Sequence, residues 1–120
     1  RQIWIGAGIG ITPFIARMKE LARRPDGVAI DFFHPTSVYE PAAIDRLAAD
    51  ARAAGVRLHV VTSGRDGRLD GARVRSLVPD WRTASVWFCG PVAFGEALRR
   101  DFLANGLPAA RFHQELFEMR

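Results

Sequence analysis

The sequence of 120 residues has a single cysteine, Cys89, and a single lysine, Lys19. A lone cysteine excludes an internal disulfide. No apolar run approaches the roughly 20 residues that span a bilayer, so this chain is not expected to enter a membrane itself. Arginine therefore supplies nearly all the positive charge, and the net charge is +4. The arginines are scattered without interleaved aromatics, which argues against nucleic-acid binding and fits attraction of a small polyanion.

The composition is that of a soluble globular protein, with 48% hydrophobic and 25% charged residues. A length of 120 residues suits one domain, so residues 1–120 are interpreted as a single unit. The chain opens directly on a strand-like segment, with neither methionine nor a leader before it. We therefore expect the first residue to mark a domain boundary within a longer protein.

Apolar segments alternate with helical patterns along the chain. Strands are expected at 2–5, 28–33, 56–62, 85–89 and 111–116, and helices at 13–24, 41–54, 71–77 and 92–105. Loops are expected at 34–40 and 63–67, and Gly55 and Gly106 are expected to cap helices. The alternation predicts an α/β fold: a doubly wound, five-stranded parallel sheet with helices on both faces, as in Rossmann-like domains. Such sheets bind ligands beyond the carboxyl ends of their strands, where the strand order reverses.

A glycine-rich segment, GAGIGITP over residues 6–13, follows the first strand. Glycines allow a tight turn and bring backbone N–H groups close to a phosphate. Thr12 is expected to cap the next helix and Pro13 to lie in its first turn, where the helix dipole favours an anion. The third glycine comes one residue earlier than in GxGxxG, and a plain strand-to-helix turn remains the alternative.

Two further segments suggest a flat cofactor. Cys89-Gly90-Pro91 ends the fourth strand, which places Cys89 at the same crevice as the glycine-rich segment. There Cys89 could pack beside a nicotinamide ring, although a buried cysteine more often serves as a small hydrophobe. Near the end of the chain, Glu115 and Phe117 are two residues apart and so share one face of a strand. Such an aromatic could cover a cofactor, but aromatics are more often core residues.

Together these segments resemble the C-terminal nucleotide-binding domain of the ferredoxin–NADP reductase superfamily, over nearly the whole chain. The resemblance implies that Cys89 lies against the nicotinamide carbon that gives up hydride, with Gly90 and Pro91 completing its motif. It also implies that Phe117 stacks on a flavin ring and that Glu115 supports that site. The residues that would hold the dinucleotide's pyrophosphate are Gly8, Gly10, Ile11, Thr12 and Pro13.

The stretches VWFCGPVAFGEALRRDF and RFHQELFEMR look most like bacterial ferric-reductase-like transmembrane proteins, which are similar to NADPH oxidases. Those proteins join a haem-binding membrane domain, a flavin-binding barrel and a nucleotide-binding domain. This chain shows neither the barrel motif nor a membrane helix. We therefore expect FAD, and any haem, to belong to neighbouring domains of a membrane-anchored parent protein. This chain is expected on the cytoplasmic side of a bacterial inner membrane. The chain alone is expected to be inactive, and no metal site is expected within it.

The choice between NADPH and NADH depends on the segment after the third strand. In the family, a serine and an arginine there often bind the 2′-phosphate of NADP, and Ser63, Arg65 and Arg68 offer both types. Arginine suits a phosphate because its fork donates two hydrogen bonds. No acid ends the second strand, where a NAD-specific domain usually has one. NADPH is therefore favoured over NADH, and a solvated loop with incidental arginines is the alternative.

Other functions are consistent with parts of this pattern. A regulatory nucleotide-binding module would keep the glycine-rich segment but would need neither Cys89 nor Phe117. A flavodoxin-like or response-regulator domain has the same fold class, but a response regulator needs an acidic cluster at the strand ends. Asp31 lies inside the second predicted strand instead. The terminal electron acceptor is left open.

Overall fold

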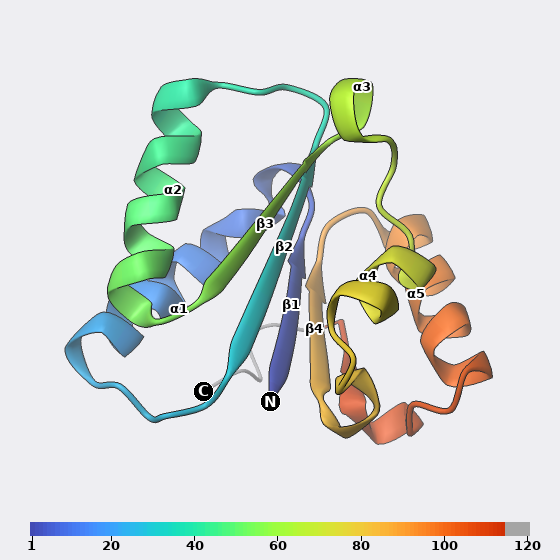
Figure 1. Ribbon diagram of the computed structural model, residues 1–120. Coiled ribbons are helices and arrows are strands. Elements are labelled where there is room, and N and C mark those ends of the chain that lie inside the picture. Colours follow the sequence, from blue (N-terminus) through green and yellow to red (C-terminus); the bar gives the residue numbers. More distant parts are fainter. Residues whose placement is uncertain (115–120) are drawn as a thin grey trace.

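The computed structural model describes residues 1–114. Five parallel strands form a sheet in the order β3-β2-β1-β4-β5 (Figure 1). The strands are β1 (Gln2–Gly6), β2 (Ile30–Thr36), β3 (Arg57–Thr62), β4 (Ser85–Cys89) and β5 (Phe112–His113). From β1 the chain builds the sheet outward through β2 and β3, and then returns to the other side of β1 with β4. The strand order therefore reverses between β1 and β4.

Helices cover both faces of this sheet. The α-helices are α1 (Thr12–Arg23), α2 (Pro41–Ala54), α3 (Ser63–Asp66), α4 (Gly71–Leu77) and α5 (Val92–Ala104). Three short 3-10 segments are η1 (Gly8–Ile11), η2 (Trp81–Thr83) and η3 (Ala109–Arg111). Helices α1 and α2 lie on one side of the sheet, and α4 and α5 lie on the other (Figure 1). This is the doubly wound α/β fold that the sequence predicted.

Two apolar clusters, one on each face, hold the layers together. On the α1 and α2 face, Phe14, Met18 and Leu21 of α1 are buried at helical spacing against Trp4 and Phe32 of the sheet. On the other face, Ile3, Ile5 and Phe33 alternate with those strand residues and pack toward α4 and α5. Because the central strands are buried on both faces, they read in the sequence as nearly continuous apolar runs.

The second strand differs most from its prediction. It begins at Ile30 rather than Val28, and it continues through His34 and Pro35 to Thr36, a segment predicted to be a loop. Along 34–36, β2 pairs with β3, whereas its pairing with β1 ends at Phe33. Proline lacks a backbone donor, and it is tolerated here because β2 has no β1 partner at this point.

Smaller differences lie at the other ends of the elements. Residues 63–66 form the short helix α3 rather than a glycine-rich loop, since the Asp66 carboxylate accepts a hydrogen bond from the Thr62 N–H at 2.9 Å. Gly55 caps α2 as predicted, with φ of 71°. The last strand is described for Phe112–His113, and the rest of its predicted range from residue 115 lies outside the described residues. Within residues 1–114, no helix is long and apolar enough to cross a membrane.

Candidate functional site

A cleft of about 650 Å³ opens at the carboxyl ends of the strands, next to the point where the strand order reverses. This is where doubly wound sheets bind their ligands. Its walls come from four parts of the chain: the glycine-rich segment after β1 (residues 6–13), called the first loop from here on, the end of β2, the segment after β3 and the start of α5. The lining residues are Ala7, Gly8, Pro35, Thr36, Ser37, Val61, Ser63, Gly67, Arg68, Leu69, Pro91, Ala93, Phe94 and Ala97.

The first loop presents two backbone N–H groups at this edge. Gly8 has φ of 59°, a left-handed conformation that favours glycine, and Gly8 and Ile9 are exposed. In the part of the chain that the structure describes, neither the Gly8 nor the Ile9 N–H has a hydrogen-bond acceptor. These groups begin η1, which runs directly into α1, so the helix dipole adds to their affinity for an anion.

The other predicted loop residues are placed differently. Ile11 begins α1 as its N-cap, and the Thr12 hydroxyl donates to the Ile9 carbonyl at 3.1 Å. The prediction that the Thr12 side chain caps α1 is therefore wrong, because its hydroxyl closes the 3-10 turn instead. Pro13 lies in the first turn of α1 as predicted. Gly10 is buried, and its N–H donates to the Ala7 carbonyl at 2.9 Å.

The loop formed by Cys89, Gly90 and Pro91 after β4, called the Cys89 loop, lies directly beside the first loop. The Cys89 carbonyl accepts a hydrogen bond from the Ala7 N–H at 3.0 Å. The Cys89 side chain is only partly buried and packs against the cluster on the α1 and α2 face, so it does not line the cleft. Pro91 lines the cleft, whereas Gly90 does not. The structure thus places the cleft and the cysteine side chain close to the same edge but on different sides of it.

The residues after β3 divide into free and engaged groups. Ser63 and Arg68 line the cleft, and the Arg68 side chain makes no ion pair or hydrogen bond within residues 1–114. Arg65 is outside the lining: its guanidinium bonds the Asp66 carboxylate at 3.2 Å and lies 4.9 Å from the centre of the Tyr39 ring. The hydrogen bond to Asp66 also raises the pKa of Arg65. Arg68 is therefore the cation of this segment that is available to a ligand.

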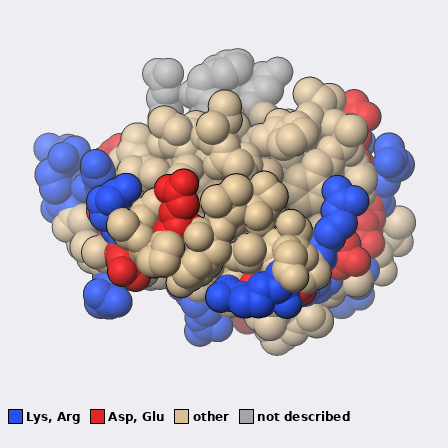
Figure 2. All heavy atoms as spheres, turned by 90° about the horizontal axis from the view of Figure 1, so that it is seen from above, with Lys and Arg blue, Asp and Glu red and all other residues tan. Residues whose placement is uncertain are grey.

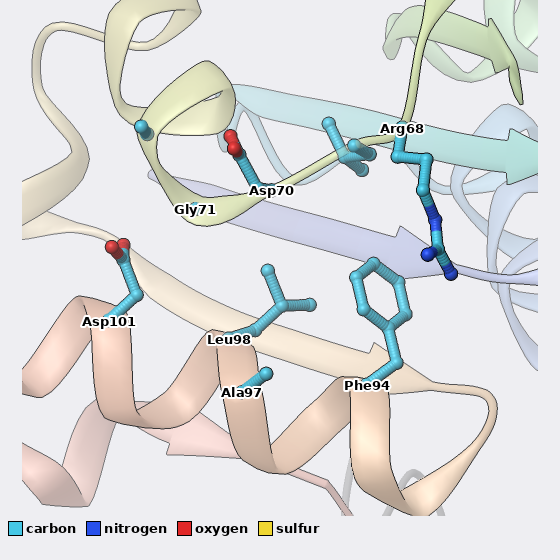
Figure 3. A pocket seen from close by; sticks show the side chains of 9 residues that line it. Arg68, Asp70, Gly71, Phe94, Ala97, Leu98 and Asp101 are labelled. Carbon is cyan, nitrogen blue, oxygen red and sulfur yellow. The ribbon is translucent and has the colours of Figure 1, made fainter.

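A narrower groove of about 330 Å³ continues from the cleft between α4 and α5. Figure 3 shows Arg68 and Phe94 pointing toward one another from opposite walls at one end of this groove. Farther along the groove, the Asp70 carboxylate caps α4 by accepting a hydrogen bond from the Arg73 N–H at 2.9 Å. Asp101 forms an ion pair with Arg75 at 3.0 Å. Sequence reasoning missed Phe94 because its helical spacing indicated only a core position.

His34 supports the base of the first loop from the neighbouring strand. Its Nδ1 donates to the Gly6 carbonyl at 2.7 Å, and the side chain is buried. Burial lowers the pKa of His34, which keeps the ring neutral near pH 7 with its proton on the nitrogen that the carbonyl needs. No sequence pattern indicated this role for His34, since residues 34–40 were predicted to be a loop.

The acid considered for a response regulator lies away from the cleft. Asp31 is near the amino end of β2 and is only 2% exposed. Its carboxylate is bonded by Arg1 and by His59, both at 2.9 Å. A phosphoacceptor would have to be accessible at the carboxyl end of a strand, so this geometry argues against that alternative.

The carboxyl edge as a whole is poor in charge at its centre. Figure 2 looks onto this edge from above: uncharged residues cover much of the middle, and basic side chains lie toward the rim. Two large apolar side chains are strongly exposed beside the two loops, Ile9 at 94% and Val92 at 70%.

Glu115 and Phe117, the residues predicted to lie beside the flavin, are outside the described residues, and their roles stay predictions.

Comparisons with known proteins agree with the observed fold. The chain is 39% identical over 93 residues to an NADPH oxidoreductase of Mycobacterium tuberculosis, covering 74% of this chain and 24% of that protein. The cytochrome P450 reductase GcoB of Amycolatopsis superposes with a TM-score of 0.72 at 28% identity, over 95% of this chain and 36% of that one. The FAD/NAD binding domain of nitric oxide dioxygenase from Vibrio cholerae superposes with a TM-score of 0.76 at 23% identity. This match covers 94% of this chain and 49% of that one.

The chain has the same fold as the matching parts of GcoB and of the nitric oxide dioxygenase domain. It spans between about a quarter and a half of the length of these three proteins. No protein-family model matches the sequence. The predicted likeness to flavin-dependent reductases is confirmed at the level of fold and sequence similarity, whereas the narrower likeness to membrane-anchored ferric reductases stays a prediction.

Proposed function

We propose that this chain binds NADPH or NADH and presents the nicotinamide for hydride transfer to an FAD held by a neighbouring domain of the same parent protein. The observation that carries this proposal is the pair of Gly8 and Ile9 N–H groups, which have no hydrogen-bond acceptor within residues 1–114, at the mouth of a cleft of about 650 Å³. That arrangement fits a pyrophosphate, and the similarity to an NADPH oxidoreductase supports the same ligand class.

The cleft suggests how the dinucleotide lies. Its pyrophosphate would sit on the first loop, with the adenosine half toward Ser63 and Arg68. The nicotinamide would cross the sheet edge toward Cys89, and Glu115 and Phe117 would complete that end of the site. The hydride chemistry belongs to the bound cofactors, and this chain supplies binding and orientation. Haem and membrane attachment stay predictions about other parts of the parent.

The proposal is tested by replacing Gly8 with asparagine. Asparagine tolerates the left-handed conformation at Gly8 and nothing lies within 4 Å of the new Cβ, so the fold should persist. Its side chain would stand over the N–H groups, and affinity for both NADP⁺ and NAD⁺ should fall by about tenfold or more, as expected for lost charge-assisted bonds. Calorimetric titration of the folded variant measures this loss.

Gly27→Asn is the matched control. Gly27 has φ of 76° with open space around it, and it lies in the turn between α1 and β2, away from the cleft. We expect its nucleotide affinity to equal that of the unmodified chain. If the unmodified chain binds neither nucleotide, the proposed function is wrong. If Gly8→Asn binds as well as Gly27→Asn, the first loop is not the pyrophosphate site.

We further propose that Arg68 gives the chain a preference for NADP over NAD. Arg68→Ala should weaken NADP⁺ binding by roughly tenfold to a hundredfold, the worth of a charge-assisted hydrogen bond, and should change NAD⁺ binding little. Arg65→Ala should have a smaller effect because that guanidinium is already held by Asp66 and Tyr39. Parallel titrations with the two nucleotides check this. Equal losses for NADP⁺ and NAD⁺ would show that Arg68 does not read the 2′-phosphate.

A further inference from the structure

We infer that Gly10 is a positioning residue that fixes Cys89 beside the nicotinamide, and that it is not a ligand of the pyrophosphate. This inference rests on the proposed function and assigns a distinct task to one glycine of the first loop. It concerns four residues from two loops, Ala7 and Gly10 of the first and Cys89 and Gly90 of the second. We call this group the interlock.

Hydrogen bonds join the two loops of the interlock. Gly6, the last residue of β1, lies opposite Cys89 in the parallel register of β1 and β4. The next residue, Ala7, donates its N–H to the Cys89 carbonyl at 3.0 Å. The Gly10 N–H turns inward to the Ala7 carbonyl at 2.9 Å. Gly10 therefore has no N–H to offer a phosphate, in contrast to Gly8 and Ile9.

The two loops also pack so closely that each has a glycine where the other touches it. A Cβ on Gly10 would lie 2.7 Å from the Cys89 carbonyl carbon, closer still to its oxygen, and 3.2 Å from the Gly90 nitrogen. A Cβ on Gly90 would lie 2.9 Å from the Ala7 Cβ. Each loop thus needs a glycine where the other approaches. Gly8 differs because nothing lies within 4 Å of its missing side chain.

The interlock lies where the dinucleotide must cross the sheet edge. The cleft extends between the first loop and α5, whereas the Cys89 side chain packs on the α1 and α2 side. A ligand that fills the cleft and also reaches Cys89 passes over both loops. Because the loops are bonded and packed together, anchoring the pyrophosphate on one also fixes the position of the other. An error of about 1 Å in such positioning can cost on the order of a hundredfold in rate.

Gly10→Ala tests this inference sterically. The backbone at Gly10 is not in the left-handed region, so alanine can adopt it and the main new feature is the collision with the Cys89 loop. Gly64→Ala is the matched control, since Gly64 also lacks a positive φ and has nothing within 4 Å of its Cβ. Affinity for ADP reports on the pyrophosphate site. The rate of alkylation by iodoacetamide reports on Cys89 alone, because the chain has no other cysteine.

We expect Gly10→Ala to keep ADP affinity within about threefold while the alkylation rate of Cys89 changes by about fivefold or more, since thiol reactivity follows its local surroundings. Gly64→Ala should change neither. In a parent protein that contains the flavin domain, Gly10→Ala should lower kcat and leave KM for NADPH nearly unchanged. A loss of ADP affinity with unaltered Cys89 reactivity would overturn the inference and make Gly10 a phosphate ligand.

A second measurement covers the case in which Gly10→Ala fails to fold. In the unmodified chain, titration with inorganic pyrophosphate is followed through backbone amide resonances. We expect the Cys89 and Gly90 amides to shift together with those of Gly8 and Ile9, with one common Kd. Shifts confined to Gly8 and Ile9 would overturn the inference. Absence of any NADP⁺ or pyrophosphate binding would instead count against the proposed function, so the two failures are distinguishable.

Discussion

Replacing Phe14 with alanine is expected to lower the free energy of unfolding by about 3–5 kcal/mol, the usual cost of emptying a buried aromatic site. Phe14 is fully buried, and its ring centre lies 5.2 Å from that of Trp4 and 5.1 Å from that of Phe32. Because domains of this size are stable by only about 5–15 kcal/mol, the loss is a large fraction of the total. Thermal and denaturant unfolding of the purified chain measure it.

The same substitution should also affect the nucleotide site. The Phe14 ring packs under the first loop, where a Cβ on Gly6 would lie 2.9 Å from its Cδ2 atom. Phe94→Ala provides the comparison, since Phe94 is only partly buried and lines the cleft. We expect Phe94→Ala to lower NADP⁺ affinity with a smaller loss of stability. If Phe14→Ala melts within a few degrees of the unmodified chain, where roughly 10–20 °C is expected, the packing interpretation is wrong.

The fold was predictable because its strongest signals are periodic. The helical spacing of Phe14, Met18 and Leu21 indicated α1, and the alternation of strands and helices indicated the parallel sheet. The extent of β2 was not predictable, because pairing with β3 extends the strand through His34 and Pro35 despite the low strand propensity of proline. The α3 helix was likewise missed, since a bond between the Asp66 carboxylate and the Thr62 N–H closes it.

The location of the candidate site was predictable from the sequence, but the different contacts of its residues were not. The glycine-rich segment correctly indicated a loop at the carboxyl edge, because glycine takes the positive φ of Gly8 more readily than other residues do. The sequence treated Arg65 and Arg68 alike, and only the folded chain shows Arg65 engaged with Asp66 and Tyr39. The glycines at 8 and 10 also looked equivalent, although one is open and the other is packed against Cys89. The contacts of Arg65 with Tyr39 and of Gly10 with Cys89 join segments far apart in the sequence, and the pairing of Arg65 with Asp66 depends on the helical turn of α3.

Cys89→Ala is expected to slow hydride transfer by roughly tenfold to a hundredfold in a parent protein that contains the flavin domain, because the nicotinamide would lose the surface that orients it. Stability should change little, since the Cys89 side chain is only partly buried. Removing one partly exposed sulfur atom should lower the free energy of unfolding by less than about 1 kcal/mol, given about 0.8 kcal/mol per buried methylene group. Stopped-flow reduction of the flavin by NADPH, beside a thermal melt, separates these two effects.

Cys89→Ser is the matched control, because serine keeps a side chain of similar size while replacing the polarizable sulfur. If the cysteine acts by filling space beside the nicotinamide, Cys89→Ser should retain more of the rate than Cys89→Ala. NADP⁺ affinity should be similar in both variants, since the pyrophosphate and adenosine half bind in the cleft, which Cys89 does not line. A normal rate of flavin reduction in Cys89→Ala would contradict the orienting role. Failure of the unmodified parent to reduce flavin, with nucleotide binding intact, would favour a regulatory nucleotide-binding module, which needs the first loop but not the cysteine.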